Sequence, residues 1–91
     1  NNGGGIVGGG ADNFVATFAE RPPLPPADAI QELRIGSPGI PAALVSIDSR
    51  TQLTVSFDAT ALPPGSHAVY VLFTTPNGAQ LTLTSTNRFS P

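Results

Sequence analysis

The side chains that could do chemistry are few, and the sequence separates each from suitable partners. His67 is the only histidine and there is no cysteine, whereas a zinc site needs three or four nitrogen, sulfur or carboxylate ligands. Asp48 and Asp58 bracket one segment, but their spacing matches no calcium loop. We expect His67 to be a solvated turn residue, both aspartates to cap turns, and neither a metal nor another cofactor to bind.

Phosphate-loop and nucleophile chemistry are equally poorly supported. A phosphate loop is a glycine-rich segment that ends in a lysine and connects a strand to a helix. No lysine follows the triple-glycine runs at residues 3–5 and 8–10. None of the seven serines has a histidine and an acid at a spacing typical of a catalytic triad. The sequence therefore predicts a protein that is not an enzyme. The hydroxyl-rich segment 74–86 could carry O-linked sugar, or could simply be the outward face of an exposed strand pair.

Composition argues against several partners. The 91 residues hold four arginines, no lysine and six acids, for a net charge of −2, so the clustered cations that bind nucleic acid or a membrane surface are missing. The longest apolar run, residues 68–73, is far too short for membrane insertion. Nine threonines and seven serines are typical of secreted β proteins. Because the chain has no methionine, we expect a cleaved signal peptide or excision from a longer protein, and an extracellular or cell-surface location.

Alternating apolar and polar residues predict an all-β fold with six strands. The period is clearest where Leu53, Val55 and Phe57 alternate with polar residues, and it indicates a strand with one buried face. Asn77-Gly78 favours a type I′ hairpin turn, after which Leu81 and Leu83 should point inward. The six expected strands are residues 12–20, 27–35, 43–47, 52–58, 67–75 and 79–86. Short strands at this spacing are typical of a sandwich or a barrel.

Residues 27–35 allow two interpretations. Pro26, Asp28 and the spacing of Ile30 and Leu33 fit a helix that Gly36 would end. Inward-pointing Leu33 and Ile35 fit a strand, which we favour because the neighbouring elements are all strands.

The segment from Leu53 to Thr84 resembles the second half of bacterial immunoglobulin-like and fibronectin-type modules. In those modules an alternating strand runs into a Leu-Pro-x-Gly corner and then a hairpin, as at residues 62–65 and the strand from Ala68 here. The resemblance implies an immunoglobulin-like antiparallel β-sandwich. The paired cysteines and core tryptophan of antibody domains are missing, so any relation is distant. Phe57 and Phe73 should be core residues.

The amino-terminal part resembles the donor strand of pilin-type filament subunits, which leaves its own body and fills a groove in the next subunit. On this interpretation residues 1–20 are an extended glycine-rich arm, residues 21–27 a stiff proline-rich spacer, and residues 28–91 the sandwich body. Six glycines carry a large entropy cost, so we expect a neighbour to order the arm. The predicted subunit-interface residues are Ile6, Val7, Phe14, Ala16 and Phe18.

Three function hypotheses follow for the whole chain. The first is a structural subunit of an extracellular filament, pilus or surface layer, a head-to-tail homopolymer in which the inserted strand covers an exposed sheet edge. The second is an accessory or adhesion module of a larger secreted protein, with residues 1–27 as a linker. A carbohydrate-binding module is a third, weaker hypothesis, because only Tyr70 is left as an unassigned aromatic residue.

Overall fold

The structure is a computed structural model, and it describes residues 11–36 and 39–91. These residues form seven strands and two single-turn 3₁₀ helices. In chain order they are β1 (Ala11–Thr17), η1 (Ala27–Ala29), β2 (Ile30–Ile35), β3 (Ile40–Pro41), β4 (Ala43–Ile47), β5 (Gln52–Asp58), η2 (Ala59–Ala61), β6 (Val69–Thr74) and β7 (Gln80–Thr84). The all-β prediction is confirmed, and β3 is the strand that the sequence pattern missed.

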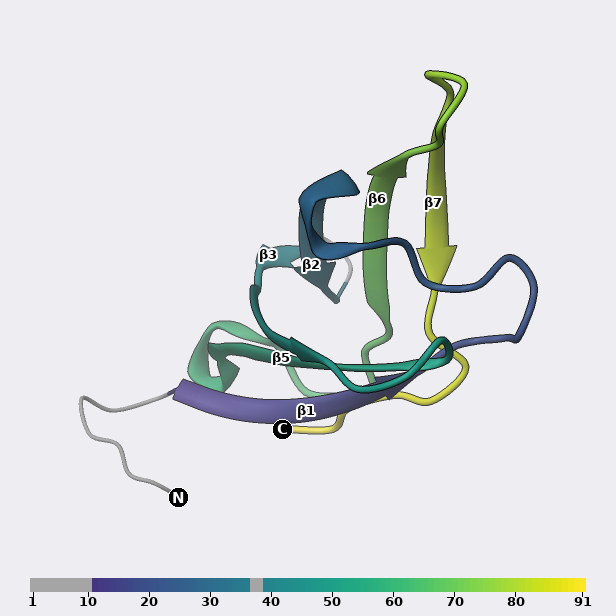
Figure 1. The fold of residues 1–91 in the computed structure, drawn as a ribbon. Helices are drawn as coiled ribbons and strands as arrows, with labels where there is room; N and C mark the ends of the chain where they lie inside the picture. Colours follow the sequence, from purple (N-terminus) through teal and green to yellow (C-terminus); the bar gives the residue numbers. More distant parts are fainter. Residues whose placement is uncertain (1–10, 37–38) are drawn as a thin grey trace.

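The strands form two antiparallel sheets with the arrangement of a β-sandwich. The three-stranded sheet has the order β1-β5-β4, and the four-stranded sheet has the order β3-β2-β6-β7. In Figure 1 the strands β1 and β5 run across the view while β6 and β7 run vertically in opposite directions, so the strands of the two sheets cross. The chain changes sheet after β1, β3 and β5, which ties the two layers together three times.

The core lies between the inner faces of the two sheets and follows the period of two in the sequence. In β5 every second side chain is buried, with Leu53 and Val55 fully enclosed and Phe57 nearly so. Val71 and Phe73 of β6 do the same from the opposite sheet. Burial of each such side chain stabilises the fold by about 1.5–3 kcal/mol. The predicted core positions of Phe57 and Phe73 are confirmed.

Residues 27–35 combine both interpretations of the sequence. The first three form the single turn η1, which follows Pro26 and holds no buried residue. From Ile30 the chain becomes β2, in which Leu33 and Ile35 are buried and Arg34 is exposed. The preferred strand is therefore confirmed from Ile30 onward, because the paired β6 offers an apolar inner face that a longer helix could not match.

The hairpin between β6 and β7 is confirmed, but its predicted turn type is wrong. A type I′ turn needs positive φ at both central residues, and among the described residues only glycines have positive φ. Within this turn Gly78, at φ 90°, has a positive φ and Asn77 does not. Its N–H donates to the Thr75 carbonyl at 2.9 Å, and the Thr75 N–H donates to the Ala79 carbonyl at 2.7 Å. Pro76, whose ring fixes a negative φ, thus begins a longer loop that ends in one left-handed glycine.

Candidate contact site

Two of the predicted interface residues, Phe14 and Ala16, belong to β1 and a third, Phe18, follows it directly, and this part of the chain packs on its own body. Ala16 pairs with Leu53 and Phe14 with Val55, both in β5 of the same chain. Ala16 is fully buried and Phe18 is 4% exposed, so both contribute to the core of this chain. Insertion of this strand into a neighbour would first require its removal from β5.

The other two predicted interface residues, Ile6 and Val7, lie outside the described residues. The predicted division into an arm of residues 1–20 and a body of residues 28–91 does not match the structure, because β1 pairs with β5 of the body. The proline-rich spacer connects two parts of one sandwich, since β1 is bonded to β5 along its whole length. What remains of the predicted arm is the segment of residues 1–10.

The carboxy-terminal segment holds the outer edge of β1. The carboxamide of Asn87 accepts from the Thr17 N–H and donates to the Val15 carbonyl, both at 2.9 Å. The Thr86 N–H donates to the Thr17 carbonyl at 2.7 Å. The Phe89 ring packs edge-on against Phe57 and also against Phe14, with ring centroids 4.9 and 5.6 Å apart. Sequence reasoning missed this clamp, because no local pattern links residues about seventy positions apart.

The residues considered for chemistry have structural roles instead. His67 is 7% exposed, so its expected place in solvent is wrong. Its Nε2 lies 2.8 Å from the Pro63 carbonyl, to which it donates, and its backbone pairs with that of Phe89. In residues 11–36 and 39–91, no group of three or more histidine or acidic side chains could hold a metal.

The two aspartates lie at opposite ends of β5, and Asp58 caps a turn as predicted, whereas the Asp48 carboxylate bonds to side-chain hydroxyls. Asp58 accepts from the Thr60 N–H at the start of η2. Asp48 accepts from the hydroxyls of Ser46 and Thr54, both at 2.7 Å. These hydrogen bonds, with Ser46 contributing most, lower the pKa of Asp48 below its ordinary value. The seven residues of β5 keep the two carboxylates apart, so they do not form a paired site.

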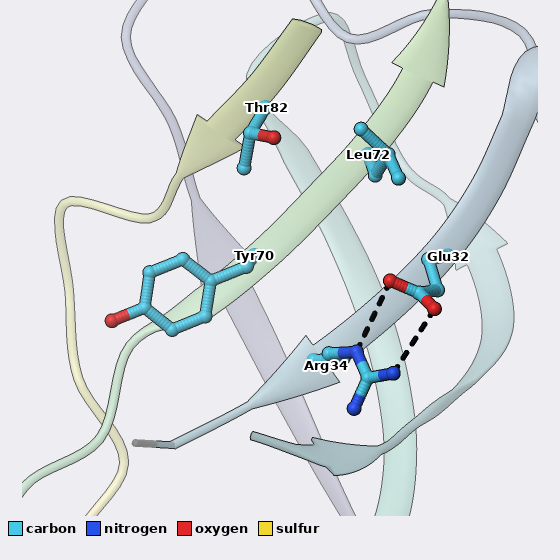
Figure 2. Close-up of a pocket in the computed structure, with 5 residues that line it drawn as sticks. All are labelled: Glu32, Arg34, Tyr70, Leu72 and Thr82. Atoms are coloured by element: carbon cyan, nitrogen blue, oxygen red, sulfur yellow. Dashed lines mark hydrogen bonds and ion pairs between the residues drawn. The ribbon is translucent and has the colours of Figure 1, made fainter. Parts of the chain in front are cut away.

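A shallow hollow of about 150 Å³ lies on the outward face of the four-stranded sheet (Figure 2). Tyr70 and Leu72 of β6 form its apolar part, with Thr82 on one side. On the other side the Arg34 guanidinium donates from Nε and Nη2 to the two oxygens of Glu32, at 3.1 and 3.0 Å. This bond lowers the pKa of Glu32 below its ordinary value of 4.5. Glu32 is therefore a carboxylate at neutral pH, paired with Arg34 and poorly suited to donate a proton.

A larger and more apolar groove, of about 440 Å³, lies where the proline-rich segment passes the end of the β6–β7 hairpin. We call it the proline groove. One wall is residues 22–26, and Phe73, Pro76 and Leu81 contribute to the other. The Leu24 N–H donates to the Arg50 carbonyl at 2.9 Å and fixes the proline wall against the β4–β5 turn. In Figure 1 this segment crosses beside β6 and β7 before it reaches η1.

Leu81 makes this groove an exposed apolar surface. It pairs with Phe73 and so lies on the inner face of its sheet, as predicted, yet 44% of it is exposed. Leu83, two residues later, packs against the core. The hairpin thus extends beyond the opposing sheet at Leu81. This groove is therefore suited to receive apolar side chains.

No family model matches this chain, and neither the curated proteins nor the solved structures compared with it gave a match. Within the described residues, no helix has the length and apolar character needed to cross a membrane.

Proposed function

We propose that the protein is a non-enzymatic, immunoglobulin-like module that serves as a structural building block of a secreted or cell-surface assembly. The order of the strands carries this proposal. Immunoglobulin sandwiches order the strands of one sheet A-B-E-D, and those of the other C-F-G, with C′ added beside C in variable domains. With β1 taken as strand B, the order β1-β5-β4 corresponds to B-E-D. The order β3-β2-β6-β7 then corresponds to C′-C-F-G.

The roles of the polar side chains support a structural protein over an enzyme. His67 is bonded inside the sandwich, and Asp48 and Asp58 hold turns. Glu32 and Arg34 bind each other. These side chains are thus engaged by partners within the chain, which is the pattern expected of a module that acts through its surface.

Two versions of this proposal differ in how the module contacts its neighbours. In the first it is a subunit of a filament, pilus or surface layer, joined to copies of itself through the amino-terminal segment. In the second it is an accessory or adhesion module of a larger secreted protein. The burial of Ala16 and Phe18 in their own chain argues against a donor strand made of residues 12–18. The exposed apolar proline groove favours the first version with a shorter donor.

The proposal is tested with the purified 91-residue chain over a wide range of concentrations. Multi-angle light scattering measures the molar mass, and electron microscopy of the concentrated sample looks for fibres. The first version predicts a mass that rises with concentration and fibres one or a few subunits wide. A monomer at every concentration would count against self-assembly and leave the accessory module. If the purified chain catalysed hydrolysis or group transfer, and a variant with a disrupted core lost that activity, the proposal that the protein is not an enzyme would be contradicted.

A further inference from the structure

We propose that Ile6 and Val7 of one copy bind in the proline groove of the next, so that the contact is head-to-tail. The inference rests on the proposed self-assembling building block and names the segment and the surface that would join its copies. Four observations support it: the character of the groove, the composition of residues 1–10, the covered edge of β1, and the limited reach of those residues.

The proline groove is suited to aliphatic side chains. Its proline wall contributes Pro22, Pro23, Pro25 and Pro26, none of which has an N–H to donate, so this wall offers little to a strand that pairs through its backbone. The opposite wall presents Phe73 and the half-exposed Leu81. Covering such a surface with apolar atoms is favourable by roughly 25 cal/mol per Å². An apolar ligand with few polar requirements is therefore the occupant that the groove selects.

The segment of residues 1–10 carries one ligand of that kind. Ile6 and Val7 are its only apolar side chains, and each is flanked by three glycines. Glycine lets a backbone pass close to another surface, so the two side chains can enter a groove without steric conflict from their neighbours. The segment has no charged side chain, which suits a groove lined almost entirely by carbon atoms.

The edge of β1 offers residues 1–10 little in the same chain. Thr86 and Asn87 already bond to the outward backbone groups of Val15 and Thr17. Only the beginning of the strand, around Asn13, is left for pairing with a preceding segment.

The groove of the same chain is out of reach. Ile6 and Val7 precede Ala11 by five and four residues, so they extend at most about 18 and 14 Å from it. Ala11 lies at the Asp58 end of β5, and the other end of β1 is about 20 Å away. Leu24 lies beyond that end, at Arg50. A second copy must therefore supply the two side chains, and because donor and acceptor lie at different places on the molecule, the contact repeats without closing.

The test uses two assembly-blocking variants of the 91-residue chain. Ile6→Asp with Val7→Asp removes the donor, and Leu81→Asp removes the acceptor. Val45→Asp is the control, because Val45 is 53% exposed on β4, away from the groove. We expect both blocking variants to raise the concentration for half-assembly at least about tenfold, and the control to assemble like the unmodified chain. Circular dichroism confirms that each variant is folded.

Mixing the two blocking variants gives the decisive result. The Leu81→Asp copy keeps an intact donor and the other copy an intact groove, so a mixture forms one contact and no more. We expect light scattering to detect a heterodimer that does not grow. If both variants assemble as the unmodified chain does, the groove contact is refuted while the building block survives. If the unmodified chain is itself monomeric, self-assembly fails together with this contact.

A peptide with the sequence of residues 1–10 tests the contact without polymerisation. It is added to the ¹⁵N-labelled donor-blocked variant, and NMR shifts are measured. We expect changes at Leu24 and Leu81, and none with a peptide that has aspartate at both apolar positions. Changes confined to Asn13 and its neighbours would instead indicate pairing at the β1 edge and would overturn the proposal, as would no change with either peptide.

Discussion

The side-chain oxygen of Asn87 accepts a hydrogen bond from the backbone N–H of Thr17, which lies 70 positions earlier in the chain and 2.9 Å away. The same carboxamide donates to the Val15 carbonyl, so one side chain satisfies two outward groups of β1. This bond closes the sandwich, because it fastens the last segment of the chain to the first strand.

Replacement of Asn87 by alanine should lower the free energy of unfolding by about 1–2 kcal/mol, since two backbone groups of β1 lose their partner. Urea denaturation measures the change. Arg88→Ala is the matched control, because the neighbouring Arg88 is exposed, and we expect a change within about 0.5 kcal/mol. Equal effects of the two substitutions would show that the clamp contributes nothing.

Replacement of Phe18 by alanine tests whether β1 packs in its own chain. Phe18 is 4% exposed, so the substitution should cost about 3–5 kcal/mol and should do so in dilute, monomeric protein. Val15→Ala is the control on the same strand, since Val15 is 46% exposed. If Phe18→Ala left the monomer as stable as the control, the strand would pack somewhere other than on its own body.

Replacement of Gly78 by alanine should destabilise the β6–β7 hairpin. At φ 90° a Cβ costs roughly 1–2 kcal/mol, and nothing lies within 4 Å of the place it would occupy, so the cost is conformational. Gly78→Asn should cost less, because asparagine tolerates the left-handed region. Thermal unfolding that ranks the asparagine variant below the alanine variant would contradict this assignment.

The Glu32–Arg34 pair makes a pH-dependent prediction. The pKa of Glu32 is lowered in the folded chain, so the pair favours folding above the ordinary pKa of a glutamate and loses this contribution as pH falls through the lowered value. Both side chains are about half exposed, so the contribution is small. NMR titration should show the pKa of Glu32 rising toward its ordinary value in Arg34→Gln. No rise would mean that the pair does not form in solution.

The sequence predicted what its local periodicity encodes. The alternation in β5, the buried Phe57 and Phe73, and the capping role of Asp58 follow from residues close together in the chain. The pairing of β1 with β5 of the same chain could not be predicted, because the alternation of apolar and polar residues in a strand is the same whether it pairs within its own chain or with a neighbour. Burial of His67 was missed for a related reason, since the backbone of Phe89, 22 positions later, completes its surroundings.

The candidate site was accessible to sequence reasoning only in part. Ile6 and Val7 are the only apolar side chains among the glycines of residues 1–10, and for this reason the sequence predicted that they bind a neighbouring subunit. The proline groove could not be predicted, because it forms where residues 22–26 meet a hairpin some fifty positions later. A proline run by itself indicates stiffness, and only its position against Phe73 and Leu81 makes it the wall of a binding surface.

Isotope-filtered NMR distinguishes pairing of β1 with β5 inside one chain from pairing between two chains. Labelled and unlabelled chains are mixed, and the contact between the Hα protons of Val15 and Thr54, which face each other in the β1–β5 register, is measured within and between chains. The account predicts a strong signal within one chain in dilute protein. A signal seen only between labelled and unlabelled chains would show that β1 completes a neighbour's sheet and would contradict the account.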